Sequence, residues 1–105
     1  MDTIYVISNP LFPDFIKIGY TNCLHTRLKK LSTSVPMAYN VIFTKKVKNA
    51  KKIEQHLHKI YSGELLLNMK NYSKEWYPIK NDFFDSLDEF IADIEKNIKW
   101  AEKVI

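Results

Sequence analysis

The sequence has 105 residues, of which 46% are hydrophobic and 27% are charged, a composition that fits one folded domain and excludes a disordered chain. Its single cysteine, Cys23, excludes a disulfide within the chain and fits a reducing compartment. The first residues lack the basic segment and apolar run of a secretory signal, and no apolar run is long enough to cross a membrane. We therefore expect one cytoplasmic domain over residues 1–105, without membrane contact.

Positive charge is concentrated in the middle of the chain. Residues 17–80 contain thirteen Lys or Arg and three acids, whereas residues 1–16 carry a net charge of −2 and residues 81–105 carry −4. A basic body favours a polyanionic partner such as nucleic acid. A lysine-rich surface that only keeps the protein soluble explains the charge equally well.

The first elements read as a hairpin. Residues 3–8 and 15–20 are rich in β-branched and aromatic residues and are joined by a short Pro-containing connection, which predicts two antiparallel strands. Side chains alternate between the faces of a strand, so that Lys17 and Gly19 are predicted to share a face.

Helical and strand patterns then alternate. Leucines at helical spacing predict a helix that is capped by Thr21 or Asn22 and runs through Leu31. Residues 39–47 alternate apolar and polar side chains and predict a third strand. Residues 50–61 place apolar side chains on one helical face and predict a second helix.

The last third of the chain reads as loop, short extended piece and long helix. Residues 62–74 are polar and predict a loop, residues 75–79 predict a short extended segment, and residues 82–101 predict an amphipathic helix with early acids and late lysines. The predicted fold class is therefore α+β: a small antiparallel sheet of about three strands flanked by helices, with a core over residues 3–79 and an added C-terminal helix.

A few polar side chains stand where the predicted fold does not need them: Tyr5, Lys17, Arg27, Glu54 and His58. Phosphodiester cleavage needs a base for water, a divalent cation and positive groups for the charge that grows on the phosphate oxygens, and this set provides all three. Each residue alone also has an ordinary structural explanation. For His58, packing against the sheet explains its position as well as a functional role does.

The order and context of these residues resemble the GIY-YIG nuclease superfamily. The resemblance is carried by IYV at 4–6, KIGYT at 17–21, IEQHLH at 53–58 and EWY at 75–77, and it is closest to the branch whose second motif reads KIG-x-T, the phage-type or meiotically up-regulated gene type domain. Thr3 replaces the glycine of the first motif, and Lys17 replaces the tyrosine of the second.

This resemblance implies a metal-dependent endonuclease that hydrolyses phosphodiester bonds in nucleic acid, in DNA rather than RNA. By the same resemblance, Tyr5 helps to activate the attacking water and Arg27 contacts the scissile phosphate. Glu54 would bind one Mg²⁺ or Mn²⁺ ion, and Gly19 leaves room beside the site. Asn68 is the candidate for a later asparagine of the family.

Further side chains are candidates for substrate contact. Lys17 would orient water or stabilise charge, and His58 would act as a proton shuttle or contact the substrate. Trp76 either closes one edge of the core or stacks on a nucleobase. A group of lysines is expected to hold phosphates without reading sequence, namely Lys29, Lys30, Lys45, Lys46, Lys48, Lys51 and Lys52.

Two other classes of function stay open. Thr3 and Lys17 favour a catalytically inactive nucleic-acid-binding module, whereas Tyr5, Arg27 and Glu54 together argue against it. A protein-interaction domain would use the acidic final helix, which has no surplus apolar face. The sequence leaves the type of nucleic acid, its strandedness, the oligomeric state and the biological role open.

Overall fold

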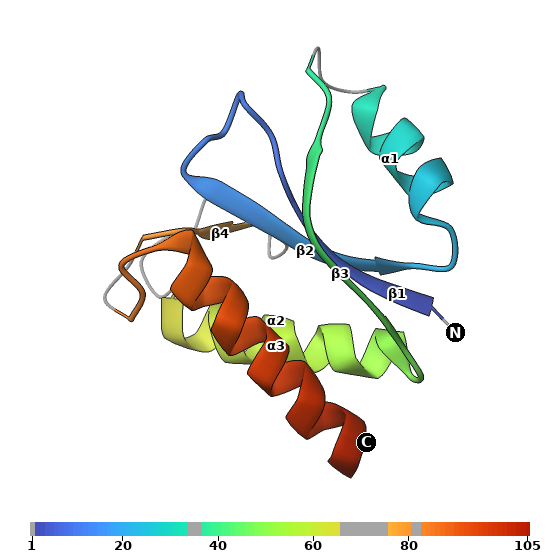
Figure 1. The fold of residues 1–105 in the computed structure, drawn as a ribbon, viewed down its shortest axis with the longest axis vertical. Helices are drawn as coiled ribbons and strands as arrows, with labels where there is room; N and C mark the ends of the chain where they lie inside the picture. The colour runs from blue at the N-terminus through green and yellow to red at the C-terminus, as the bar shows by residue number, and fades with distance from the viewer. Residues whose placement is uncertain (1, 34–36, 66–75, 81–82) are drawn as a thin grey trace.

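A computed structural model describes residues 2–33, 37–65, 76–80 and 83–105, without the side chains of 62–65. In these ranges, four strands form one antiparallel sheet in the order β3-β1-β2-β4, accompanied by three helices (Figure 1). The elements are β1 (Asp2–Ser8), β2 (Phe15–Thr21), α1 (Leu24–Ser32), β3 (Asn40–Val47), α2 (Ala50–Leu65), β4 (Trp76–Pro78) and α3 (Leu87–Val104).

The pairing of the strands places the site residues side by side. In the centre of the sheet, Tyr5 of β1 lies opposite Gly19 of β2 and Thr44 of β3. On the other side of β2, the described part of β4 pairs with Phe15, Ile16 and Lys17. Trp76 of β4 therefore lies opposite Lys17.

The two faces of the sheet are covered differently. α2 and α3 pack together on one face, where the core consists chiefly of Ile4, Val6, Ile16, Ile18, Ile53, Leu57, Tyr61, Tyr77, Phe90, Ile94 and Ile98. Each such buried aliphatic side chain contributes about 1.5–3 kcal/mol of transfer free energy. α1 lies apart from these helices, on the other side of the sheet, and has no buried residue (Figure 1). This second face carries Tyr5, Ile7, Lys17 and Gly19, which are buried but lie outside the main core.

The α+β class, the antiparallel sheet and the C-terminal helix are confirmed. The predicted number of about three strands was too low, because the short extended segment joins the sheet as β4. A three-residue strand of this kind gives too little alternation to be recognised in the sequence.

Three helix boundaries differ from the predictions. α1 begins at Leu24 rather than after Thr21, because Thr21 ends β2 and its hydroxyl accepts a hydrogen bond from the amide of Cys23 at 3.1 Å. α2 continues to Leu65, into the segment predicted as loop. α3 begins at Leu87 rather than near residue 82, because Ser86 caps it. Within the described part of the chain, no helix is long and apolar enough to cross a membrane.

Candidate functional site

The ring of Tyr5 lies across Gly19. Tyr5 is 1% exposed, and it faces Gly19 on the neighbouring strand. A Cβ atom added at Gly19 would lie 2.3 Å from the Tyr5 hydroxyl oxygen and 2.4 Å from Cζ. Real Cβ atoms do not come so close, so only glycine fits under the ring. The position of the Tyr5 hydroxyl is therefore fixed by its pairing with Gly19.

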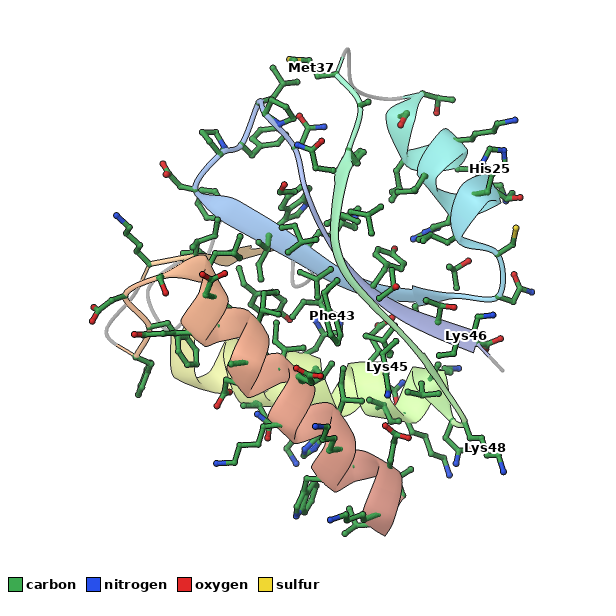
Figure 2. The ribbon with its side chains drawn as sticks, in the orientation of Figure 1. His25, Met37, Phe43, Lys45, Lys46 and Lys48 are labelled. Carbon is green, nitrogen blue, oxygen red and sulfur yellow. The ribbon has the colours of Figure 1, made fainter. Side chains whose placement is uncertain are left out.

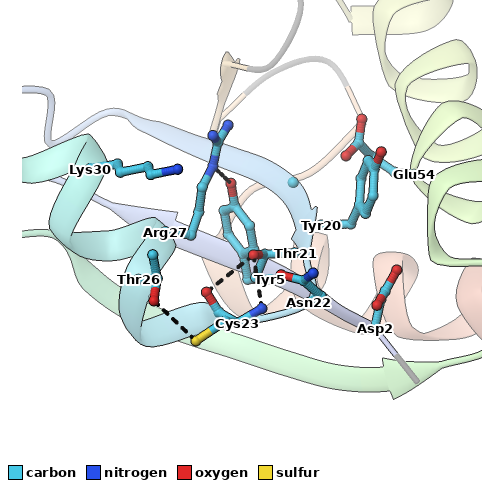
Figure 3. A pocket seen from close by; sticks show the side chains of 11 residues that line it. Asp2, Tyr5, Tyr20, Thr21, Asn22, Cys23, Thr26, Arg27, Lys30 and Glu54 are labelled. Carbon is cyan, nitrogen blue, oxygen red and sulfur yellow. Dashed lines mark hydrogen bonds between the residues drawn. The ribbon is translucent and has the colours of Figure 1, made fainter.

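Arg27 holds this hydroxyl from the side of α1. Its Nε donates a hydrogen bond of 3.3 Å to the Tyr5 oxygen (Figure 3). α1 follows β2 after a short turn in which the Thr21 hydroxyl bonds to both backbone groups of Cys23 at 3.1 Å. This turn brings the first turn of α1, which carries Arg27, to the Tyr5 hydroxyl of β1.

A pocket of about 420 Å³ opens beside this pair. Among the described residues, its lining consists of Asp2, Tyr5, Gly19, Tyr20, Thr21, Asn22, Cys23, Thr26, Arg27, Lys30 and Glu54. Figure 3 shows Arg27 meeting the Tyr5 hydroxyl on one side and Glu54 reaching the pocket from α2 on the other. Two cationic side chains, Arg27 and Lys30, and two carboxylates, Asp2 and Glu54, therefore share one concave surface.

Comparison with known families decides what kind of domain carries this pocket. The model of the T5orf172 domain family matches residues 2–101, nearly the whole chain. The chain belongs to the T5orf172 domain family. This is a phage-type domain often linked to nucleic-acid binding or nuclease-like activity, which supports a nucleic-acid-related role. No curated protein and no solved structure matches the chain.

The expected membership of the GIY-YIG superfamily is therefore wrong. The matching family is a distinct domain, and the match gives no support for a GIY-YIG assignment. The misleading signal lay in short motifs such as KIGYT at 17–21, since strand segments with glycine and tyrosine recur in small sheets for packing reasons alone. The roles of the site residues must accordingly be argued from geometry.

Five predicted residues of this T5orf172 domain meet at the pocket: Tyr5, Gly19, Arg27, Lys30 and Glu54. Lys17 does not line it. Lys17 lies two residues before Gly19 on the same face, is 9% exposed, and places its ammonium nitrogen 5.6 Å from the centre of the Trp76 ring. Trp76 is the β4 residue opposite Lys17, and its ring makes a cation–π contact with this lysine away from the pocket wall.

Trp76 is part of an aromatic cluster. Its ring centre lies 5.6 Å from that of Phe12 in an edge-to-face arrangement and 6.3 Å from that of Tyr39. Burial raises the pKa of the Tyr39 hydroxyl above its ordinary value. These contacts hold the predicted base-stacking residue against the loop between β1 and β2, at the edge of the sheet.

His58 lies behind the pocket rather than in its wall. Its Nε2 is 3.2 Å from Oε1 of Glu54, one helical turn earlier on α2. Its Nδ1 forms a hydrogen bond with the hydroxyl of Tyr77 on β4. This arrangement disfavours a direct contact of His58 with a substrate in the pocket. His58 instead touches the pocket residue Glu54.

The predicted phosphate-binding lysines occupy two regions. Lys30 lines the pocket and Lys29 is exposed beside it on α1. The others are exposed around the connection from β3 to α2, and we call this group the basic turn: Lys45, Lys46, Lys48, Lys51 and Lys52 (Figure 2). Asp2 at the pocket pairs with Val47 of β3, so that the basic turn begins beside the pocket.

The carboxylates of the pocket limit how a metal ion could bind. Among the described residues, no group of three or more His, Cys, Asp or Glu is placed to hold an ion. Asp2 and Glu54 are the carboxylates of the pocket wall. Mg²⁺ is commonly bound by about one or two carboxylates, with its other ligands from water and substrate phosphate. The two carboxylates are therefore compatible with an ion that takes its other ligands from water and substrate, and Glu54 reaches the pocket from α2.

Sequence reasoning missed several residues of the pocket wall, among them Asp2, Tyr20 and Cys23. Cys23 lines the pocket, whereas His25, two residues further along the chain, does not. A hydrogen bond with the Thr26 side chain is the main cause of a lowered pKa of the Cys23 thiol, and a hydrogen bond with the Thr26 backbone adds to it. Nothing in the sequence around Cys23 indicates that it lines the pocket. The predicted Asn68 lies outside the described residues.

Proposed function

We propose that this domain hydrolyses phosphodiester bonds in nucleic acid. The observation that carries the proposal is the meeting of the Tyr5 hydroxyl and the Arg27 side chain, 3.3 Å apart, in the pocket that Glu54 enters from the opposite side. A phenol, a guanidinium and a carboxylate in one small pocket supply the groups that phosphate hydrolysis requires. The link of the family to nucleic acid gives independent support.

In the proposed mechanism, each side chain has one task. Arg27 binds the non-bridging oxygens of the scissile phosphate, where a planar guanidinium makes paired hydrogen bonds that lysine would not match. The Tyr5 oxygen, positioned by Arg27, orients the water that attacks phosphorus. In its phenolate form, Tyr5 takes the proton of this water and becomes the neutral phenol. Lys30 adds positive charge at the pocket rim.

Glu54 is the proposed ligand of one Mg²⁺ or Mn²⁺ ion. When bound, such an ion supplies positive charge that stabilises the transition state at the phosphate. Lys17 receives no step in this mechanism, because it lies beside Trp76 and outside the pocket lining.

The basic turn is the proposed binding surface for the rest of the substrate. Its exposed lysines begin beside Asp2 at the pocket and continue onto the first turn of α2. Lysines that contact phosphates hold a nucleic acid in register without reading its sequence. The proposal therefore includes weak sequence preference and strong salt dependence.

One observation favours a second candidate, a non-catalytic nucleic-acid-binding module. Lys17 stands away from the pocket, and among the described residues the carboxylates that line it are those of Asp2 and Glu54. A binding module would need the basic turn and the pocket cations without a bound metal.

Cleavage assays separate the two candidates. Labelled single- and double-stranded DNA and RNA are incubated with the protein in Mg²⁺, in Mn²⁺ and in EDTA. We expect metal-dependent cleavage that falls by at least about 100-fold in Glu54→Gln and Arg27→Ala, as for loss of charge-stabilising groups. Glu95→Gln, an exposed carboxylate on α3, is the matched control and should cut normally. Binding without cleavage in any metal would establish the binding module instead.

A further inference from the structure

A chain of side-chain contacts connects the pocket to the main core. Glu54 lies 3.2 Å from Nε2 of His58, and Nδ1 of His58 is hydrogen-bonded to the Tyr77 hydroxyl. The side chains of Glu54 and His58 are 15% and 16% exposed, and Tyr77 is fully buried. The chain thus runs from a pocket residue to a fixed point inside the protein.

The donors and acceptors of this chain favour one arrangement. An ionised carboxylate only accepts hydrogen bonds, and a neutral imidazole has one nitrogen that donates and one that accepts. If the Tyr77 hydroxyl donates to Nδ1, the ring proton of His58 is on Nε2, the nitrogen beside Glu54. Nε2 is buried and has no hydrogen bond of good geometry within the described residues, so the carboxylate at 3.2 Å is its available acceptor. The hydroxyl therefore sets which His58 nitrogen carries the ring proton, and places it on Nε2, beside Glu54.

Tyr77 is well placed to fix the histidine. It sits in the middle of β4, where it pairs with Ile16 of β2. Its ring stacks on His58 at 5.5 Å and meets Tyr61 edge-to-face at 6.0 Å. Tyr61 is held in turn, since its hydroxyl donates to Asp93 of α3 at 2.8 Å. The anchor of the chain is thus shared by β2, β4, α2 and α3.

We propose that His58 and Tyr77 are positioning residues that hold the Glu54 carboxylate in the orientation needed for the divalent cation. This inference rests on the proposed function and adds to it the partners of its metal ligand. Neither residue lines the pocket, so neither contacts the substrate in this proposal. Outer partners that orient a metal ligand typically contribute about 10- to 100-fold to metal affinity or activity.

The test removes only the anchoring hydroxyl. Tyr77→Phe keeps the ring and its packing, so that the fold is retained, as circular dichroism and the unfolding midpoint would verify. Tyr39→Phe, which removes a partly buried hydroxyl elsewhere, is the matched control. The expected signs in Tyr77→Phe are an increased fraction of the Nδ1–H tautomer of His58 in ¹⁵N NMR spectra with the ring neutral, and about tenfold weaker Mn²⁺ binding, followed by paramagnetic broadening around Glu54.

A double-mutant cycle with His58→Gln completes the test. Glutamine retains a neutral amide donor and no longer depends on the hydroxyl of Tyr77, so we expect Tyr77→Phe to have no further effect on Mn²⁺ binding in this background. An unchanged tautomer and unchanged Mn²⁺ affinity in Tyr77→Phe would overturn the proposal. Failure of the wild-type protein to cut any nucleic acid would instead overturn the proposed function, while the tautomer and Mn²⁺ measurements would still decide the positioning role.

Discussion

At the scale of single residues, the candidate site depends on a close fit between a tyrosine ring and a glycine. Tyr5 is buried in β1, and the missing side chain of Gly19 provides the space in which its hydroxyl lies. Arg27 then meets that hydroxyl from α1. The position of the guanidinium in the pocket is therefore linked to the absence of a Cβ atom on β2.

Gly19→Ala tests this fit. The added methyl group would lie 2.3 Å from the Tyr5 oxygen, so that the ring must move away from its contact with Arg27. We expect a loss of about 1–3 kcal/mol in the free energy of unfolding, measured with urea. Tyr5→Leu removes the clashing atoms, so that Gly19→Ala should cost less in that background. Equal costs in both backgrounds would contradict the described fit.

Cys23 gives a prediction about pH. Hydrogen bonding by Thr26 lowers the pKa of the Cys23 thiol, so that the thiolate forms at lower pH than in an ordinary cysteine. The rate of alkylation by iodoacetamide should therefore rise with pH at a lower midpoint in the folded protein than in urea. Thr26→Val removes the side-chain hydrogen bond, which is the largest cause of the lowered pKa, and should move this midpoint upward while the backbone contribution stays. A midpoint that Thr26→Val leaves in place would show that the side chain has no part in it.

The sequence predicts which residues gather at the pocket better than how they are arranged. Tyr5, Arg27 and Glu54 stood out as polar side chains in apolar elements, and all line one pocket. Lys17 stood out in the same way, but its surroundings depend on Trp76, which is distant in sequence and joins through β4. Local patterns carry no information about such long-range pairing. The catalytic and metal-binding roles of these residues stay predictions.

At the scale of the elements, two strands and two helices meet at the site. β1 and β2 place Tyr5 opposite Gly19, and α1 and α2 bring Arg27 and Glu54 to the same pocket. The class of each main element could be read from periodicity, whereas its ends could not. The start of α3 shows why: Asn81 and Asp82 are residue types that cap helices, but the helix begins only after Ser86.

The start of α3 is fixed by a reciprocal cap. The amide of Glu89 donates to the Ser86 hydroxyl at 3.3 Å, and the Glu89 carboxylate accepts from the amide of Asp85 at 3.0 Å. We expect Ser86→Ala to lower the free energy of unfolding by about 1 kcal/mol, because one amide of the first turn loses its partner. Ser86→Asp supplies another cap acceptor and should retain most of the stability in the same urea titration. If Ser86→Ala and Ser86→Asp are equally destabilised, the cap is not the cause.

At the scale of the whole molecule, opposite charges are separated along the chain. The basic turn lies between β3 and α2 and begins beside the pocket, through the pairing of Asp2 with Val47. Acidic residues of the C-terminal segment lie on α3, namely Asp88, Glu89, Asp93, Glu95 and Glu102, and of these Glu102 lies beside the basic turn. The positive charge of the basic turn therefore attracts a polyanion to the neighbourhood of the pocket.

This asymmetry predicts which lysines contribute to nucleic-acid binding. Lys46→Gln/Lys48→Gln removes two charges from the basic turn, and Lys99→Gln/Lys103→Gln removes two from α3, all at exposed positions. Each phosphate contact that is lost should flatten the dependence of log affinity on log salt concentration by about 0.9 for double-stranded DNA. We expect the first variant to bind more weakly to every sequence tested and to show a flatter salt dependence, in fluorescence anisotropy titrations over a series of salt concentrations. The second variant has the same net charge as the first, but its salt dependence should be close to that of the wild type. Equal effects of the two variants would mean that net charge alone governs binding, and that the basic turn has no special place in it.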